Sequence, residues 1–251
     1  MTAVFTLAKR EVQSFFMSPI AYVVLLVWLI VSGIQFYLLA EFFSTQPMGG
    51  SGTNSPLSAF FGGTTLFYLL LCIFVPIITM RLIAEEKSSG TLETLLSAPI
   101  TELSVVLGKY LAAICFWCVL WAPTGIYVWL AAATGEDVID FGVIASTYIG
   151  LFCLGVFYMA VGLLMSAVSR NQIVAATLTF LVLAALFLLN MFVFIDSSGG
   201  VRGAIFEYIG MWSQMEAFSK GVLDTRFIVY DISLAALCVF LSIRALQANR
   251  W

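Results

Sequence analysis

Long apolar runs dominate the chain, and short polar segments separate them. A helix needs about 20 consecutive apolar residues to cross the hydrocarbon core of a membrane. The pattern predicts six spans, of which the third and fourth are longer than a bilayer requires and are expected to tilt or protrude. The predicted spans cover approximately residues 20–40, 64–84, 104–133, 141–168, 173–195 and 228–245.

The segment before the first span is amphipathic rather than wholly apolar. Phe5 and Val12 share one face of a helix, whereas Lys9 falls on the other side. Residues 3–17 are therefore expected to form a helix that lies in the membrane interface. The alternative is that they are the first turns of the first span. Pro19 separates the two segments and favours the interfacial helix.

The composition supports an integral membrane protein. The chain has 251 residues, of which 62% are hydrophobic and 10% are charged, whereas soluble domains carry about 25% charged residues. Such a composition cannot supply a water-facing surface. The net charge of −3 argues against a nucleic-acid partner, because nucleic-acid-binding domains show basic patches.

The distribution of lysine and arginine predicts the orientation, because these residues favour cytoplasmic loops. With six spans both termini share one side, and that side would hold eight of the eleven Lys and Arg residues. Two loops on the other side, 41–63 and 134–140, contain none. Both termini and the 85–103 segment are therefore expected to be cytoplasmic.

An outer segment, 196–227, contains a stretch that is hard to place. Residues 204–218 are too polar to span and too apolar to form a free loop. We expect a re-entrant or interfacial helix there. A seventh span would instead leave Glu207 and Glu216 in hydrocarbon, which costs a few kcal/mol for each charge. The candidate residues of this segment are Phe206, Glu207, Trp212 and Glu216.

The chain lacks the residues that common membrane enzymes need. It contains no histidine, the commonest metal ligand and the usual general base near neutral pH. Cys115 and Cys118 form a C-x-x-C pattern, which without a second pair is interpreted as two small residues on one helix face. Gly108-Lys109-Tyr110 has no glycine-rich loop before it, so it is no ATP-binding P-loop. We therefore expect no catalytic residue, metal or cofactor in this chain.

A compact charged hairpin, residues 85–103, follows the second predicted span. Arg81 and Glu85 are spaced to form an i,i+4 ion pair. Ser88-Ser89-Gly90 is expected to break the helix. Thr91–Ser97 then reads as a two-turn amphipathic helix, with an apolar face made by Leu92, Leu95 and Leu96.

An ordinary charged turn would explain the charges of this hairpin but not its leucine face. A helix of two turns is not stable alone and needs a surface to pack on. Its acidic residues are unfavourable against anionic lipid. A soluble protein partner is therefore the favoured interpretation.

The hairpin sequence also carries a family resemblance. RLIAEEKSSGTLETLLSAPI (81–100), followed by GKYLA, resembles the signature of type-2 ABC-transporter permeases, and the layout of the whole chain is similar to theirs. EAFSKGVLDTR (216–226) before the last span resembles the gliding-motility-type subgroup of these permeases.

The resemblance implies an all-α permease of a bacterial inner membrane. Two permease subunits would pair, and each would rest on a separate cytoplasmic ABC ATPase that binds ATP and magnesium. The N-terminal helix would lie beside the hairpin, and the hairpin would couple ATP hydrolysis to export or to mechanical work. The implied interface residues are Arg81, Glu85, Glu86, Gly90, Thr91, Leu92, Glu93, Leu95, Leu96 and Pro99.

Two other functions stay open at this point. A secondary transporter or channel would work without an ATPase, although the ionisable residues of the spans lie near span ends, which disfavours ion coupling. A non-transporting scaffold subunit is also compatible with the sequence. The largely uncharged spans suggest a lipid-like or amphipathic cargo, if there is one.

Overall fold

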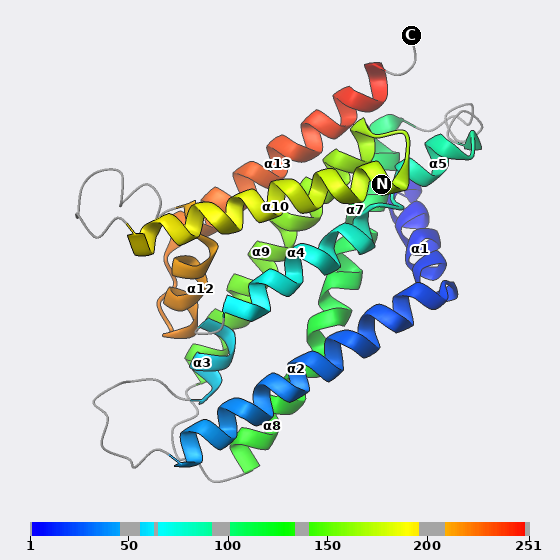
Figure 1. Ribbon diagram of the computed structural model, residues 1–251. Coiled ribbons are helices and arrows are strands. Elements are labelled where there is room, and N and C mark those ends of the chain that lie inside the picture. The colour runs from blue at the N-terminus through cyan, green and yellow to red at the C-terminus, as the bar shows by residue number, and fades with distance from the viewer. Residues whose placement is uncertain are drawn as a thin grey trace.

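The protein is a bundle of helices in a computed structural model that describes residues 2–45, 56–62, 65–91, 101–133, 141–195 and 209–248. Within these ranges all regular structure is helical, as the sequence predicted (Figure 1). The elements are α1 (Thr2–Met17), α2 (Pro19–Thr45), α3 (Pro56–Gly62), α4 (Thr65–Thr79), α5 (Ala84–Ser88), α7 (Glu102–Trp121), η1 (Ala122–Thr124), α8 (Gly125–Ala133), α9 (Phe141–Val168), α10 (Gln172–Ile195), α12 (Met211–Ser219) and α13 (Thr225–Ala248).

Five helical stretches are long and apolar enough to cross a membrane. They are Pro19–Thr45, Glu102–Leu130, Phe141–Val168, Gln172–Leu189 and Thr225–Ala248. They correspond to the first, third, fourth, fifth and sixth predicted spans. The chain is therefore a multi-pass membrane protein.

The second predicted span, 64–84, is divided in the structure. Its helix, α4, has 15 residues, which cover about 22 Å. The chain turns after Thr79 and resumes a helix at Ala84. Pro76 lies within α4, and its carbonyl oxygen accepts a hydrogen bond from the Met80 amide at 2.9 Å. The helix therefore ends, and the turn begins, about one helical turn after the proline.

Helix α9 is the centre of the bundle. In its apolar membrane-spanning stretch 72% of the residues are buried, compared with 22% in each of the corresponding stretches of α2, α10 and α13. It packs against α4, α7, α10, α12 and α13. Close contact is possible because α9 carries glycines at its crossings. A Cβ atom on Gly155 would lie 2.1 Å from Trp117 Nε1, and one on Gly162 would lie 2.2 Å from Thr79 Oγ1.

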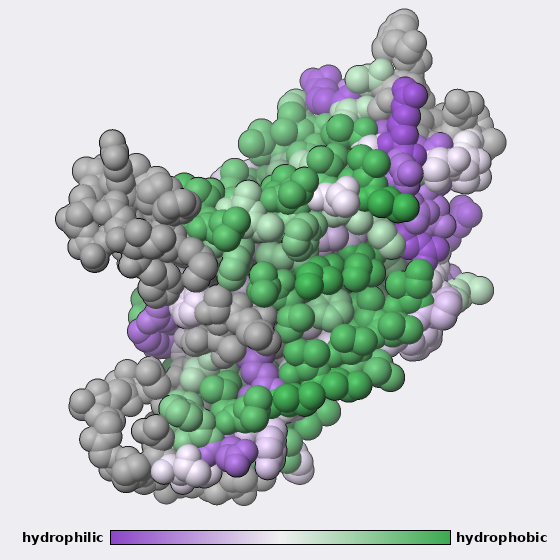
Figure 2. Space-filling model, viewed as in Figure 1, coloured by the Kyte–Doolittle hydropathy of each residue, from purple (hydrophilic) through white to green (hydrophobic). Residues whose placement is uncertain are grey.

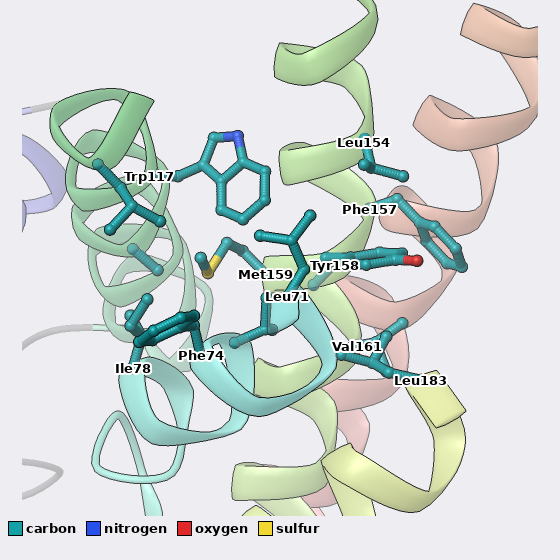
Figure 3. Close-up of a cluster of buried hydrophobic side chains, with 14 of the residues drawn as sticks. Leu71, Phe74, Ile78, Trp117, Leu154, Phe157, Tyr158, Met159, Val161 and Leu183 are labelled. Atoms are coloured by element: carbon teal, nitrogen blue, oxygen red, sulfur yellow. The ribbon is translucent and has the colours of Figure 1, made fainter. Parts of the chain in front are cut away.

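The core around this crossing is aromatic and aliphatic. Figure 3 shows Trp117 of α7 and Leu71 of α4 converging on Met159 of α9. The indole nitrogen of Trp117 donates a hydrogen bond to the Leu151 carbonyl oxygen at 3.0 Å. This bond satisfies a buried polar group that would otherwise lower stability inside the membrane.

The two ends of the bundle differ in polarity. Figure 2 shows a broad apolar surface and hydrophilic residues gathered at the end that carries α1 and α5. The beginning of α1 and the end of α13 also lie at that end (Figure 1). We call it the charged end. The opposite end carries α3 and α12, and we call it the far end.

Candidate coupling site at the charged end

The residues of the predicted hairpin that the structure describes are held by ion pairs. Arg81 donates from Nε to Glu85 Oε2 at 2.8 Å, which confirms the predicted i,i+4 pair. Arg81 also donates from Nη1 to Ser18 Oγ at 2.8 Å, so the hairpin is tied to the junction of α1 and α2. The Arg81 guanidinium holds the pKa of the Glu85 carboxyl below its ordinary value.

A second ion-pair cluster joins three helices. Lys109 Nζ, on α7, lies 2.9 Å from Glu86 Oε1 of α5 and 3.0 Å from Glu11 Oε1 of α1. The Lys109 side chain is only 6% exposed, and the two carboxylates are about a quarter exposed. The lysine therefore fixes α1 and the hairpin to the same side of α7.

Helix α1 reaches this lysine because α7 has a glycine beside it. A Cβ atom on Gly108 would lie 2.9 Å from Leu7 Cβ and 3.3 Å from the Val4 carbonyl oxygen. Any larger residue would push α1 away from α7. The Gly108-Lys109 pair thus combines a close helix crossing with the charge that bridges it.

The turn between α4 and α5 is capped from α9. Ser166 Oγ accepts hydrogen bonds from the backbone amides of Ile83 and Ala84, both at 3.0 Å. These amides have no acceptor within the broken helix, so the serine supplies the partner that a buried N–H requires. Lys87 Nζ donates to the Ala167 carbonyl oxygen, and burial lowers the pKa of the Lys87 ammonium, with Arg170 adding to the effect.

The first helix of the hairpin ends where the sequence predicted a break. Helix α5 ends at Ser88, and Gly90 has a φ of +72°, in the left-handed region that glycine adopts readily. Thr101 caps α7 by accepting a hydrogen bond from the Ser104 amide at 3.3 Å. Five predicted interface residues lie outside the described residues: Leu92, Glu93, Leu95, Leu96 and Pro99.

A pocket of about 280 Å³ opens between α1, α5 and α7. Three basic and three acidic residues line it, namely Arg10, Glu11, Arg81, Glu85, Glu86 and Lys109, together with Ser89 and Thr91. Glu86 Oε2 is buried and has no hydrogen-bond partner in the described chain. The Glu86 carboxylate is therefore held within the described chain through Oε1, by Lys109.

Glu11, Lys109 and Ser166 belong to this site, but no local sequence pattern indicated their roles. The sequence around Lys109 matched only a false P-loop fragment and a family motif. The available sequence signal was a lysine directly after a glycine near the start of an apolar run. Its two acidic partners lie 98 and 23 residues away in the sequence.

The outer-segment candidates lie at the far end or outside the described residues. Phe206 and Glu207 lie outside the described residues. Trp212 is half-buried and Glu216 is exposed on α12, where Glu216 pairs with Lys220 at 2.5 Å. Helix α12 packs closely on α9, because a Cβ atom on Gly150 would lie 2.5 Å from the Phe218 ring.

The fold and the site together define a multi-pass membrane protein with a cluster of ion-paired helices at one end. The chain matches the family described as ABC-2 family transporter protein over residues 5–199, and it belongs to that family. It is thus a membrane permease component of an ABC transporter, and membership implies association with an ATPase subunit. A search among curated proteins found no match.

Proposed function

We propose that the charged end is the docking surface for a separate cytoplasmic ABC ATPase, and that the chain transmits ATP-driven movement into the membrane. The observation that carries this proposal is the Lys109 cluster, which joins α1, α5 and α7 through two ion pairs. A force applied to the hairpin would be carried directly into α7, because Lys109 is part of that helix.

The Ser166 cap gives the hairpin a second connection. Movement of the turn at Ile83 would be transmitted to α9, the most buried of the five long apolar helical stretches. The three basic and three acidic residues that line the charged pocket suit charged groups of the ATPase. These contacts support a rigid attachment surface rather than a loosely tethered turn.

The remaining features of the proposal rest on family membership and on the sequence pattern. We infer six spans, with α4 as the short second span, and cytoplasmic termini in a bacterial inner membrane. A second permease subunit would complete the substrate path, with the 204–218 segment re-entrant or interfacial at its outer mouth. Export or mechanical work is the expected output, within a gliding-motility-type subgroup. ATP and magnesium would be bound by the ATPase, and no cofactor by this chain.

Purification of the tagged protein in mild detergent, with identification of partners and an ATPase assay, tests this proposal. A co-purifying P-loop ATPase that hydrolyses ATP is the expected result. Glu93→Arg should lower the ATPase activity of the complex while the protein still inserts, because it reverses charge on the predicted docking helix. Isolation of the protein without an ATPase would favour a channel or secondary carrier.

A further inference from the structure

A buried carboxylate lies inside the bundle toward the far end, away from the coupling site. Asp231 is the seventh residue of α13 and is 2% exposed. The sequence places it near a span end, whereas the structure buries it among the helices. No hydrogen bond or ion pair to Asp231 occurs within the described residues. Arg226, the cation nearest to it along α13, is held by Asp224 at 2.8 Å.

Asp231 lines a small cavity between α9, α10, α12 and α13. The cavity has a volume of about 10 Å³, close to the least in which one water-sized group fits. Its other polar walls are Gln214, Tyr158 and Tyr230, and its apolar walls include Leu154 and Leu186. Gln214 and Tyr158 are almost fully buried, so the polar groups face inward rather than toward lipid.

Aromatic rings surround the same cavity. The Phe157 ring lies 5.8 Å from the Tyr158 ring and 6.3 Å from the Tyr230 ring, measured between centroids. Figure 3 shows Phe157 and Tyr158 extending from α9 toward α13. Aromatic faces attract cations, and a carboxylate beside several rings is a combination that recognises amines.

We infer that this cavity binds the primary ammonium group of an amphiphile. The ammonium group is about the size of water, so it fits where a trimethylammonium group would not. Its three N–H donors match the two carboxylate oxygens of Asp231 and the hydroxyl oxygen of Tyr158. Leucine side chains suit an adjoining alkyl chain. A divalent cation would need more oxygen ligands, and no cluster of three metal-ligating side chains occurs in the part of the chain described.

The assignment of the amphiphile as cargo depends on the proposed transport function, but binding itself does not. The amine could also come from a lipid headgroup such as that of phosphatidylethanolamine. Either source presents the same chemistry to Asp231. Both can be tested on the purified protein without any ATPase.

The test measures the thermal unfolding midpoint of the protein in phosphatidylcholine nanodiscs at neutral pH. Saturating n-octylamine should raise the midpoint by at least about 2 °C. Octan-1-ol and octyltrimethylammonium have the same alkyl chain and should not raise it. Equal shifts for the three compounds, or no shift with octylamine, would overturn the proposal.

Two variants test whether the octylamine shift arises from binding in the cavity. Asp231→Asn keeps the side-chain shape and should abolish the octylamine shift, whereas Glu41→Gln, an exposed residue near the end of α2, should retain it. A shift that survives in Asp231→Asn would also overturn the proposal. If Asp231→Asn does not fold, Tyr158→Phe, which removes one acceptor, should raise the octylamine concentration for half-maximal shift at least threefold.

A second nanodisc composition distinguishes the sources of the amine. If the lipid headgroup is the ligand, nanodiscs containing phosphatidylethanolamine should raise the midpoint of the wild-type protein without octylamine, and should not do so for Asp231→Asn. If the ligand is a free cargo amine, this lipid should leave the midpoint unchanged. Loss of the ATPase interaction would leave all of these results intact, so the two proposals can fail separately.

Discussion

Lys109 Nζ and Glu86 Oε1 lie 2.9 Å apart, although residues 89–101 separate α5 from α7 in the chain. The same ammonium contacts Glu11 of α1 at 3.0 Å. One buried lysine therefore holds both α1 and the hairpin. A permease that receives force at its hairpin needs such a connection, since a flexible hairpin would move without moving its spans.

Lys109→Met should destabilise the protein by about 1–3 kcal/mol. The substitution leaves two partly buried carboxylates close together without their cation. The thermal unfolding midpoint in detergent measures the effect. Lys9→Met, which removes an exposed charge on α1, is the matched control and should be nearly neutral. Equal midpoints for the two variants would show that the cluster does not support the fold.

Ser166→Ala should cost about 1–3 kcal/mol of stability. It removes the shared acceptor of the Ile83 and Ala84 amides, and each buried N–H left without a partner is unfavourable. Thermal unfolding again provides the measurement. Ser233→Ala is the control, because Ser233 is exposed and hydrogen-bonds only within its own helix. If both variants unfold at the wild-type temperature, the turn after α4 does not depend on the cap.

Gly155→Ala should destabilise the contact between α9 and α7 by about 1–3 kcal/mol. The added methyl group would lie 2.1 Å from the Trp117 indole nitrogen, whose ring is almost fully buried. Gly33→Ala provides the comparison, since its nearest neighbour would be the Tyr127 hydroxyl at 3.4 Å. Tryptophan fluorescence and the unfolding midpoint should change for the first variant and remain close to wild type for the second.

The Arg81–Glu85 pair should contribute to stability only at pH values at which Glu85 is ionised. The pKa of Glu85 is lowered in the fold by Arg81, so the pair contributes above the ordinary glutamate pKa. That contribution is lost as pH falls through the lowered value. Both side chains are partly exposed, so a double-mutant cycle with Arg81→Met and Glu85→Gln should give less than about 1 kcal/mol at pH 7.

The same cycle repeated below about pH 4 should show the coupling decline toward zero. High salt should also reduce it, because the pair is accessible to solvent ions. A coupling that is constant between pH 7 and pH 3 would show that the two residues interact through packing and not through charge.

The sequence predicted the local features of this protein well. Apolar run length gave the helical membrane class, Pro19 marked the boundary between α1 and α2, and Gly90 marked the end of α5. The Arg81–Glu85 pair could also be predicted from the sequence, because its partners are four residues apart. Each of these features depends on neighbours within a few turns of helix.

The features that were missed depend on contacts distant in sequence. Glu11 and Lys109 are 98 residues apart, and Ser166 is more than 80 residues from the turn that it caps. Asp231 was expected near a span end, but only the packing of α13 on α9 shows that its side chain is enclosed. Hydropathy fixes how deep a residue lies along a span and not which neighbours it meets.

Photo-crosslinking to the ATPase tests the central claim most directly. A photoreactive amino acid would replace exposed Ser88 at the charged end or exposed Leu223 at the far end, in cells that make the complete transporter. A P-loop ATPase, identified by mass spectrometry, should be captured from position 88 and not from position 223. Capture from position 223 alone, or from neither position, would contradict the assignment of the charged end as the coupling site.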